Sequence, residues 1–259
     1  MTIKIKDAFK NGKAFMPFIL AGDPNLDATG RFIVSMAKAG ADLIEIGIPF
    51  SDPVAEGQVI QAASKKALDS GTTTDGIFDM VASIRDKVDI PLLLMTYINP
   101  IFVYGKDKFF TKCQEVGICG VIVPDMPFEE KDELLAPANA HGVEVVSLIA
   151  PTSEDRIGMI AKEAQGFIYC VSSLGTTGVR SEIKTDLNSI VSTIRKYTDV
   201  PTAIGFGIST PEQAQKMASI ADGAIVGSAV IKIIDKYAGN AEQPIYEYVK
   251  KMKDAVRKA

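Results

Sequence analysis

The sequence of 259 residues has no tryptophan, three cysteines and a single histidine. Cys113, Cys119 and Cys170 are an odd number without C-x-x-C spacing, which indicates neither a disulfide framework nor a zinc site. His141 stands alone, where a helix is predicted to end. Metal-dependent lyases usually hold their metal with two or three imidazoles. The sequence therefore argues against metal-ion catalysis, and we predict no metal ligands.

Runs of like charge and long apolar runs are also missing. Lysine and arginine never cluster beyond a pair and the formal net charge is -4, so nucleic acid and anionic lipid are not the indicated ligands. No stretch approaches the roughly 18 uncharged residues of a membrane span, and the N-terminal segment lacks the apolar centre of a signal peptide. We expect a soluble cytoplasmic protein that binds a small molecule.

Short apolar runs alternate with amphipathic, helix-like segments along the whole chain. Continuous apolar runs bounded by Gly and Pro are typical of buried parallel strands. A doubly wound sheet is the alternative, but no G-x-G-x-x-G follows the first run. Eight such units in about 250 residues predict a single (β/α)8 barrel domain over residues 1–259, with an extra N-terminal helix and a short extra helix after strand 8. The runs are residues 15–22, 41–47, 90–97, 119–125, 143–151, 166–173, 200–207 and 222–229.

One of these runs contains a carboxylate. In "ADLIEIGIPF" the alternation of a strand places Glu45 on the face opposite Ile44 and Ile46, so Glu45 is predicted to point into the barrel near its upper rim. Burial raises the pKa of an unpaired carboxyl towards neutrality, where it can both give and take a proton. An internal ion pair is the alternative, but none of the predicted strands contains a lysine or arginine.

A second acid follows in the loop "PFSDPVAEG". Glu56 precedes a helix-like segment, where a carboxylate is stabilised by free backbone N–H groups. Taken alone it would be a helix cap. Its place eleven residues after Glu45, on the same rim, makes it a candidate second carboxylate of an active site.

Glycine-bearing loops follow the last three predicted strands, in "SSLGTTGVR", "GFGIST" and "VGSAVIK". Loops at this end of a barrel often bind phosphate through backbone N–H groups. We predict a phosphate site that includes Gly178, Gly207, Gly227 and Ser228. Any one of these loops would be weak evidence, because turns need glycine anyway.

The remaining chemistry is acid/base catalysis on a phosphorylated substrate, since there is no inward lysine for a Schiff base and no G-x-S-x-G elbow. The stretches "AFMPFILAGDP", "EIGIPFSDPVAEGQVIQ", "LLLMTYINPIFVYG", "VIVPDMP", "GFIYCVSSLGTTGVR", "IGFGIST" and "GAIVGSAVIK" resemble, in order and over nearly the whole chain, the tryptophan synthase alpha subunit family. The P-F-S-D-P stretch after a strand-borne glutamate is close to diagnostic of that family.

The resemblance implies retro-aldol cleavage of indole-3-glycerol phosphate to indole and glyceraldehyde 3-phosphate, without a metal or a Schiff base. It implies that Glu45 is the acid/base and that Glu56 accepts a hydrogen bond from the indole N–H. The family is expected to have aspartate at that second position, so Glu56 is a departure by one methylene. The implied indole pocket, for whose aromatic residues ordinary barrel packing is the alternative, contains Phe18, Tyr97, Tyr169 and Phe206, with Thr177 in a loop that orders over the site.

The resemblance also implies a partner. This is a beta subunit that carries pyridoxal phosphate and receives indole within an α2β2 complex, so no cofactor is expected on this chain. Asp52 and the loop from Asn99 to Tyr104 are the surfaces expected to meet it. Another phosphate-binding barrel enzyme is a rival interpretation, but it would place catalytic lysines or a cysteine-aspartate pair on strand ends, and this chain has none there. A catalytically weak subunit that mainly activates the beta subunit stays open as the alternative.

Overall fold

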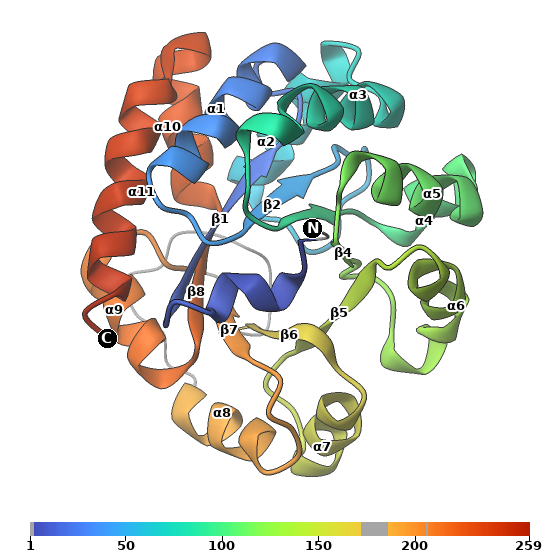
Figure 1. Ribbon diagram of the computed structural model, residues 1–259, viewed down its shortest axis with the longest axis vertical. Helices are drawn as coiled ribbons and strands as arrows, with labels where there is room; N and C mark the ends of the chain where they lie inside the picture. Colours follow the sequence, from blue (N-terminus) through green and yellow to red (C-terminus); the bar gives the residue numbers. More distant parts are fainter. Residues whose placement is uncertain (1–2, 172–185, 206) are drawn as a thin grey trace.

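The computed structural model describes residues 3–171, 186–205 and 207–259. Its strands form a closed barrel in which each one pairs in parallel with the next and the last pairs with the first, as Figure 1 shows. The predicted (β/α)8 barrel is confirmed. The strands are β1 (Ala14–Leu20), β2 (Ile44–Gly47), β3 (Leu92–Met95), β4 (Gly120–Ile122), β5 (Glu144–Ile149), β6 (Gln165–Val171), β7 (Thr202–Gly205) and β8 (Gly223–Val226).

Helices surround the barrel (Figure 1). None of those in the described part of the chain is long and apolar enough to cross a membrane. The α-helices are α1 (Leu26–Lys38), α2 (Gln58–Asp69), α3 (Thr74–Ile84), α4 (Ile98–Tyr104), α5 (Lys106–Val116), α6 (Asp132–Ala140), α7 (Glu154–Lys162), α8 (Leu187–Arg195), α9 (Pro211–Ile220), α10 (Ser228–Tyr237) and α11 (Glu242–Val256), and short 3-10 turns are η1 (Ile5–Phe9), η2 (Arg85–Lys87), η3 (Phe128–Glu130) and η4 (Ala238–Asn240).

The ends of the helices follow from local sequence signals. At α9 a Thr-x-x-Gln capping box is present: Thr210 Oγ1 accepts a hydrogen bond from Gln213 N at 3.3 Å, and Gln213 Oε1 accepts one from Thr210 N at 3.2 Å. At α1 the Asn25 side chain accepts a hydrogen bond from Ala28 N at 2.8 Å. These caps satisfy donors that the first turn of a helix leaves unpaired.

The end of the barrel where the strands begin is closed by the N-terminal turn. The predicted extra helix is the short 3-10 turn η1, and its Ile5 is fully buried. The Ile5 Cδ1 atom lies 2.6 Å from the position that a Cβ on Gly120 would take and 2.7 Å from that on Gly166. Gly120 is the first residue of β4 and Gly166 is the second of β6. Ile5 therefore packs against the beginnings of these two strands.

A buried ion pair ties the last helix to the same end of the barrel. Lys253 of α11 places its Nζ 2.6 Å from Asp42 Oδ2, and the two side chains are 4% and 14% exposed. Lys253 Nζ also donates to the Lys13 carbonyl at 2.9 Å, and Asp42 accepts from Phe15 N at 2.7 Å. Each charge therefore has the additional hydrogen bond that a buried ion needs.

Candidate active site

Glu45 stands in the second position of β2 and is 1% exposed. Its register partners are Phe18 of β1 and Leu93 of β3, and its buried Oε1 has no hydrogen-bond partner among the residues that the structure describes. Burial raises the pKa of Glu45 to about 8. A carboxyl group with this pKa carries a proton at pH 7 and can still release it, as a general acid and base must. The buried, unpaired carboxyl is as predicted, whereas its catalytic role stays a prediction.

Tyr169 of β6 fills the barrel interior beside this carboxyl. It is 5% exposed, and burial together with the charge of Glu45 raises the pKa of its phenol. Since β2 and β6 are not neighbours in the barrel, the two side chains meet through its interior. A Cβ on Gly205 of β7 would lie 2.3 Å from the Tyr169 hydroxyl oxygen, so the absence of a side chain there makes room for the ring.

We expect Gly205→Ala to move Tyr169 and to destabilise the protein. The added methyl group would overlap both the hydroxyl and the ring, and overpacking of this kind costs about 1 to 3 kcal/mol. The control is Gly239→Ala, because a Cβ there would meet no atom within 4 Å. Urea unfolding of both variants checks the prediction, and equal midpoints would contradict it.

Phe18 connects Glu45 to the predicted phosphate site. Its ring lies 2.6 Å from the position of a Cβ on Gly47 and 3.4 Å from that on Gly227. Gly227 precedes α10, whose first residue, Ser228, is 8% exposed. The N-terminus of a helix presents unpaired backbone N–H groups and a positive dipole end to an anion. The structure thus brings Glu45, Phe18 and the start of α10 together.

Glu56 does not cap the helix that follows it. The cap position of α2 is Gly57, and the Glu56 carboxylate, in a residue 8% exposed, accepts a hydrogen bond from the Tyr97 hydroxyl. Burial raises the pKa of Glu56, and the Tyr97 hydrogen bond opposes that rise. Tyr97 is 4% exposed, and its ring centroid lies 5.2 Å from that of Phe50. The predicted second carboxylate and one predicted pocket tyrosine are therefore direct partners.

The other predicted binding residues are only partly described. Gly207 is buried after β7 with a φ of +80°, a conformation that favours glycine. Thr177, Gly178 and Phe206 lie outside the described residues.

The surface predicted to meet a partner is a helix rather than a loop. Residues 98–104 form α4. Pro100 is compatible with this helix because it falls in the first turn, where its missing N–H costs no helical hydrogen bond. Asn99 is exposed there, and Phe102 and Val103 are 46% and 81% exposed. Asp52, also exposed, lies in the loop before α2, in which Val54 is 70% exposed.

Sequence reasoning missed Asp125. Its Oδ1 accepts a hydrogen bond from Ile98 N at 3.0 Å, which caps α4, and its charge raises the pKa of Glu56. The available signal was its position, since it is an acid shortly after β4 at the end of the barrel where the strands finish. Among residues 3–171, 186–205 and 207–259, no three His, Cys, Asp or Glu side chains are grouped so that they could hold a metal.

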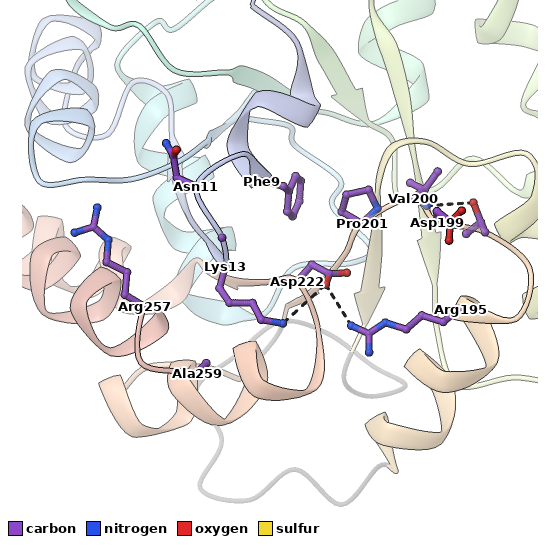
Figure 2. A pocket seen from close by; sticks show the side chains of 12 residues that line it. Phe9, Asn11, Lys13, Arg195, Asp199, Val200, Pro201, Asp222, Arg257 and Ala259 are labelled. Atoms are coloured by element: carbon purple, nitrogen blue, oxygen red, sulfur yellow. Dashed lines mark hydrogen bonds and ion pairs between the residues drawn. The ribbon is translucent and has the colours of Figure 1, made fainter.

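A hollow of about 710 Å³ lies at the opposite end of the barrel (Figure 2). Asp222, just before β8, accepts a hydrogen bond from Arg195 at 3.2 Å and lies 3.9 Å from Lys13 Nζ. Its other carboxylate oxygen accepts a bond from Thr202 N at 3.0 Å. Of the predicted site residues that the structure describes, none lines this hollow. Contacts at this end of a barrel serve stability rather than catalysis.

The comparisons with known proteins agree with this geometry. Residues 5–257 match the family model described as tryptophan synthase alpha chain. The tryptophan synthase alpha chain of Lactiplantibacillus plantarum is 50% identical over 249 residues, which cover 96% of this chain and 94% of the relative. That of Lacticaseibacillus casei is 47% identical over 253 residues, which cover 98% and 95%.

Solved structures show the same likeness. The crystal structure of tryptophan synthase subunit alpha from Legionella pneumophila has a TM-score of 0.87 and 33% identity, covering 100% of both chains. A chain of Mycobacterium tuberculosis tryptophan synthase has a TM-score of 0.90 and 27% identity, covering 99% of both. With a family model that spans almost its full length and relatives near 50% identity, the chain belongs to the tryptophan synthase alpha chain family.

Proposed function

We propose that Glu45 and Glu56 are the two carboxylates with which this chain cleaves indole-3-glycerol phosphate to indole and glyceraldehyde 3-phosphate, the lyase reaction of its family. The observation that carries the assignment is the difference between them. Glu45 is buried with a pKa of about 8 and with one oxygen that no described residue hydrogen-bonds, whereas Glu56 accepts a hydrogen bond from a phenol. Two carboxyl groups in such different environments suit different roles, one as acid and one as anion.

The protonated Glu45 carboxyl starts the reaction by giving its proton to C3 of the indole ring. The ring becomes a cation, which the Glu56 carboxylate stabilises by accepting the indole N–H. The Glu45 carboxylate then takes the proton of the side-chain hydroxyl next to C3. The bond between C3 and the side chain breaks, its electron pair returns to the ring, and an aldehyde leaves. Glu45 ends protonated, ready for the next cycle.

The substrate's phosphate is proposed to bind at the start of α10. Gly227 and Ser228 would offer backbone N–H groups there, with Gly207 and Gly178 from the two preceding loops. Phe18, Tyr97, Tyr169 and Phe206 would surround the indole ring, and Thr177 belongs to the loop proposed to order over it. Phe18 supports this arrangement because its ring lies between the Glu45 strand and Gly227.

The proposed partner is the tryptophan synthase beta subunit, in an α2β2 complex, with pyridoxal phosphate on that subunit and no cofactor on this one. The exposed apolar side chains of Val54, Phe102 and Val103 support a protein partner on the face that carries Asp52 and Asn99. We propose that the chain works in the cytoplasm, because a charged phosphate ester is costly to move into the apolar interior of a membrane and so stays where it is made.

Indole release tests this proposal. Purified protein is incubated with indole-3-glycerol phosphate, alone and with added beta subunit, and indole and glyceraldehyde 3-phosphate are measured in equal amounts. We expect both products in both tubes. If products form only with the beta subunit at a trace rate, while tryptophan synthesis from added indole accelerates, the chain mainly activates its partner. No product under either condition would overturn the proposal.

We expect Glu56→Gln to lower kcat/KM by about 10²-fold, the usual effect of removing one electrostatic contact to a transition state. The amide keeps an oxygen that can accept from Tyr97, so the loop keeps its geometry while the negative charge is lost. Glu115→Gln, an exposed glutamate that pairs with Lys112 on α5, is the control. Initial rates of indole release check the prediction, and a variant as fast as the control would contradict it.

A further inference from the structure

The hydroxyl group of Tyr97 uses every hydrogen bond that a phenol can make. Its oxygen accepts one bond from Val54 N at 2.9 Å and another from Ala55 N at 2.8 Å. Its proton is donated to Oε2 of Glu56. A hydroxyl has one proton and two lone pairs, so all three capacities are filled by consecutive residues of one loop.

This arrangement fixes the direction of the bond to Glu56. Both lone pairs of the Tyr97 oxygen accept hydrogen bonds from backbone N–H groups, so the oxygen cannot also accept a hydrogen bond from a protonated Glu56. Tyr97 can therefore only donate, and a carboxylate accepts such a bond more strongly than a neutral carboxyl does. The bond occupies one of the two Glu56 oxygens. We propose that Tyr97 is a positioning residue, which holds the loop of residues 54–56 and turns the Glu56 carboxylate to the orientation used on the substrate.

The electrostatics of the site give this role a second part. Burial raises the pKa of Glu56, the charge of Asp125 raises it further, and the Tyr97 hydrogen bond lowers it. The proposed reaction, on which this inference rests, needs Glu56 as an anion while Glu45 carries a proton. Tyr97 is the side chain that favours the charged form of Glu56, so it separates the two carboxyl groups into an acid and an anion.

The longer side chain at position 56 makes this support necessary. Glutamate has one more rotatable bond than the aspartate expected in the family, and its free carboxylate would sample several orientations. Misplacement by about 1 Å can cost a hundredfold in rate. Tyr97 stands at the N-terminal end of α4, 41 positions from Glu56 in the sequence. Its hydrogen bond to the carboxylate removes that freedom.

Tyr97→Phe tests the proposal, with Tyr197→Phe as the control. Each variant loses one phenolic hydroxyl, and Tyr197 lies between α8 and β7, at the end of the barrel where the strands begin, with its ring packed against Gly158. We measure kcat and KM for indole-3-glycerol phosphate from pH 5 to 9 in the presence of the beta subunit. For Tyr97→Phe we expect kcat to fall about tenfold at pH 7, the equivalent of one lost hydrogen bond to a charged group, with KM changed less than twofold.

The pH profile separates positioning from packing. Loss of the donor raises the pKa of Glu56, so the acid side of the kcat/KM profile should move to higher pH in Tyr97→Phe and stay in place in Tyr197→Phe. A ¹³C NMR titration of labelled glutamate gives the same pKa without turnover, and Glu56→Gln identifies the resonance. If the variant releases indole with the native pH profile and the native Glu56 titration, Tyr97 only packs and the proposal is wrong. If the native protein releases no indole, the proposed function fails instead, while the NMR titration still tests the Tyr97 bond.

Discussion

Replacing Glu45 with glutamine is expected to lower kcat for indole release by about 10² to 10⁴-fold, the range attributed to general acid/base catalysis. The amide has nearly the volume of the protonated carboxyl that native Glu45 carries at pH 7, so the fold and KM should change little. Glu144→Gln is the control, because Glu144 also has a pKa raised by burial but stands at the beginning of β5, at the far end of the barrel. Equal kcat values for the two variants would remove Glu45 from the mechanism.

The pH dependence of Glu45 has a defined sign. Its folded pKa of about 8 lies above the ordinary value of 4.5, so the folded state holds a proton that the unfolded chain releases. The contribution of Glu45 to stability is therefore fully present below pH 4.5 and is lost as pH rises towards 8, at up to about 1.4 kcal/mol per pH unit. Glu45→Gln lacks this loss, so its melting temperature should exceed the native one by a margin that grows between pH 5 and 8. In activity, native kcat/KM should fall above pH 8, because Glu45 then lacks the proton it must give.

Removing the Lys253 charge is expected to cost more stability than any surface substitution. In Lys253→Met the Asp42 carboxylate stays largely buried with the Phe15 N–H but without its cation, and breaking a buried pair in this way costs about 3 to 5 kcal/mol. Lys250→Met on the same helix is the control. Its pair with Asp254, at 3.2 Å, is about half exposed on both sides and contributes about 0.5 kcal/mol at most.

Urea unfolding at pH 7 measures both variants. A second substitution, Asp42→Asn in the Lys253→Met background, keeps an acceptor for Phe15 N and removes the stranded charge. It should therefore recover part of the loss. If Lys253→Met is no less stable than Lys250→Met, the buried pair does not stabilise the fold.

The barrel and Glu45 were predictable because both depend on local patterns. Apolar runs bounded by Gly and Pro predict buried strands, and the alternation around Ile44 and Ile46 predicts the opposite face for Glu45. The capping box at Thr210 is local as well. These features depend on residues within a few positions of one another, so the order of side chains is sufficient.

The surroundings of Glu56 were not predictable in the same way. The Tyr97 hydroxyl, the Glu56 carboxylate and the Asp125 carboxylate come from three different loops and meet only because the barrel brings the ends of β2, β3 and β4 together. The loop sequence favoured a helix cap for Glu56, and a distant phenol provided the stronger partner. The segment from Asn99 to Tyr104 was expected to be a loop but forms α4, in which Pro100 is compatible with the first turn of the helix.

The packing of Ile5 has a consequence for the order in which the molecule folds. Ile5 is translated before β1, but it packs against Gly120 and Gly166, which are translated much later. The N-terminal turn must therefore wait until β6 has been synthesised and paired. Closing contacts between residues so far apart in the chain is slow, because the intervening chain must be ordered before the contact contributes. The floor of the barrel is thus completed only after β6 has been made, by a turn that is translated before β1.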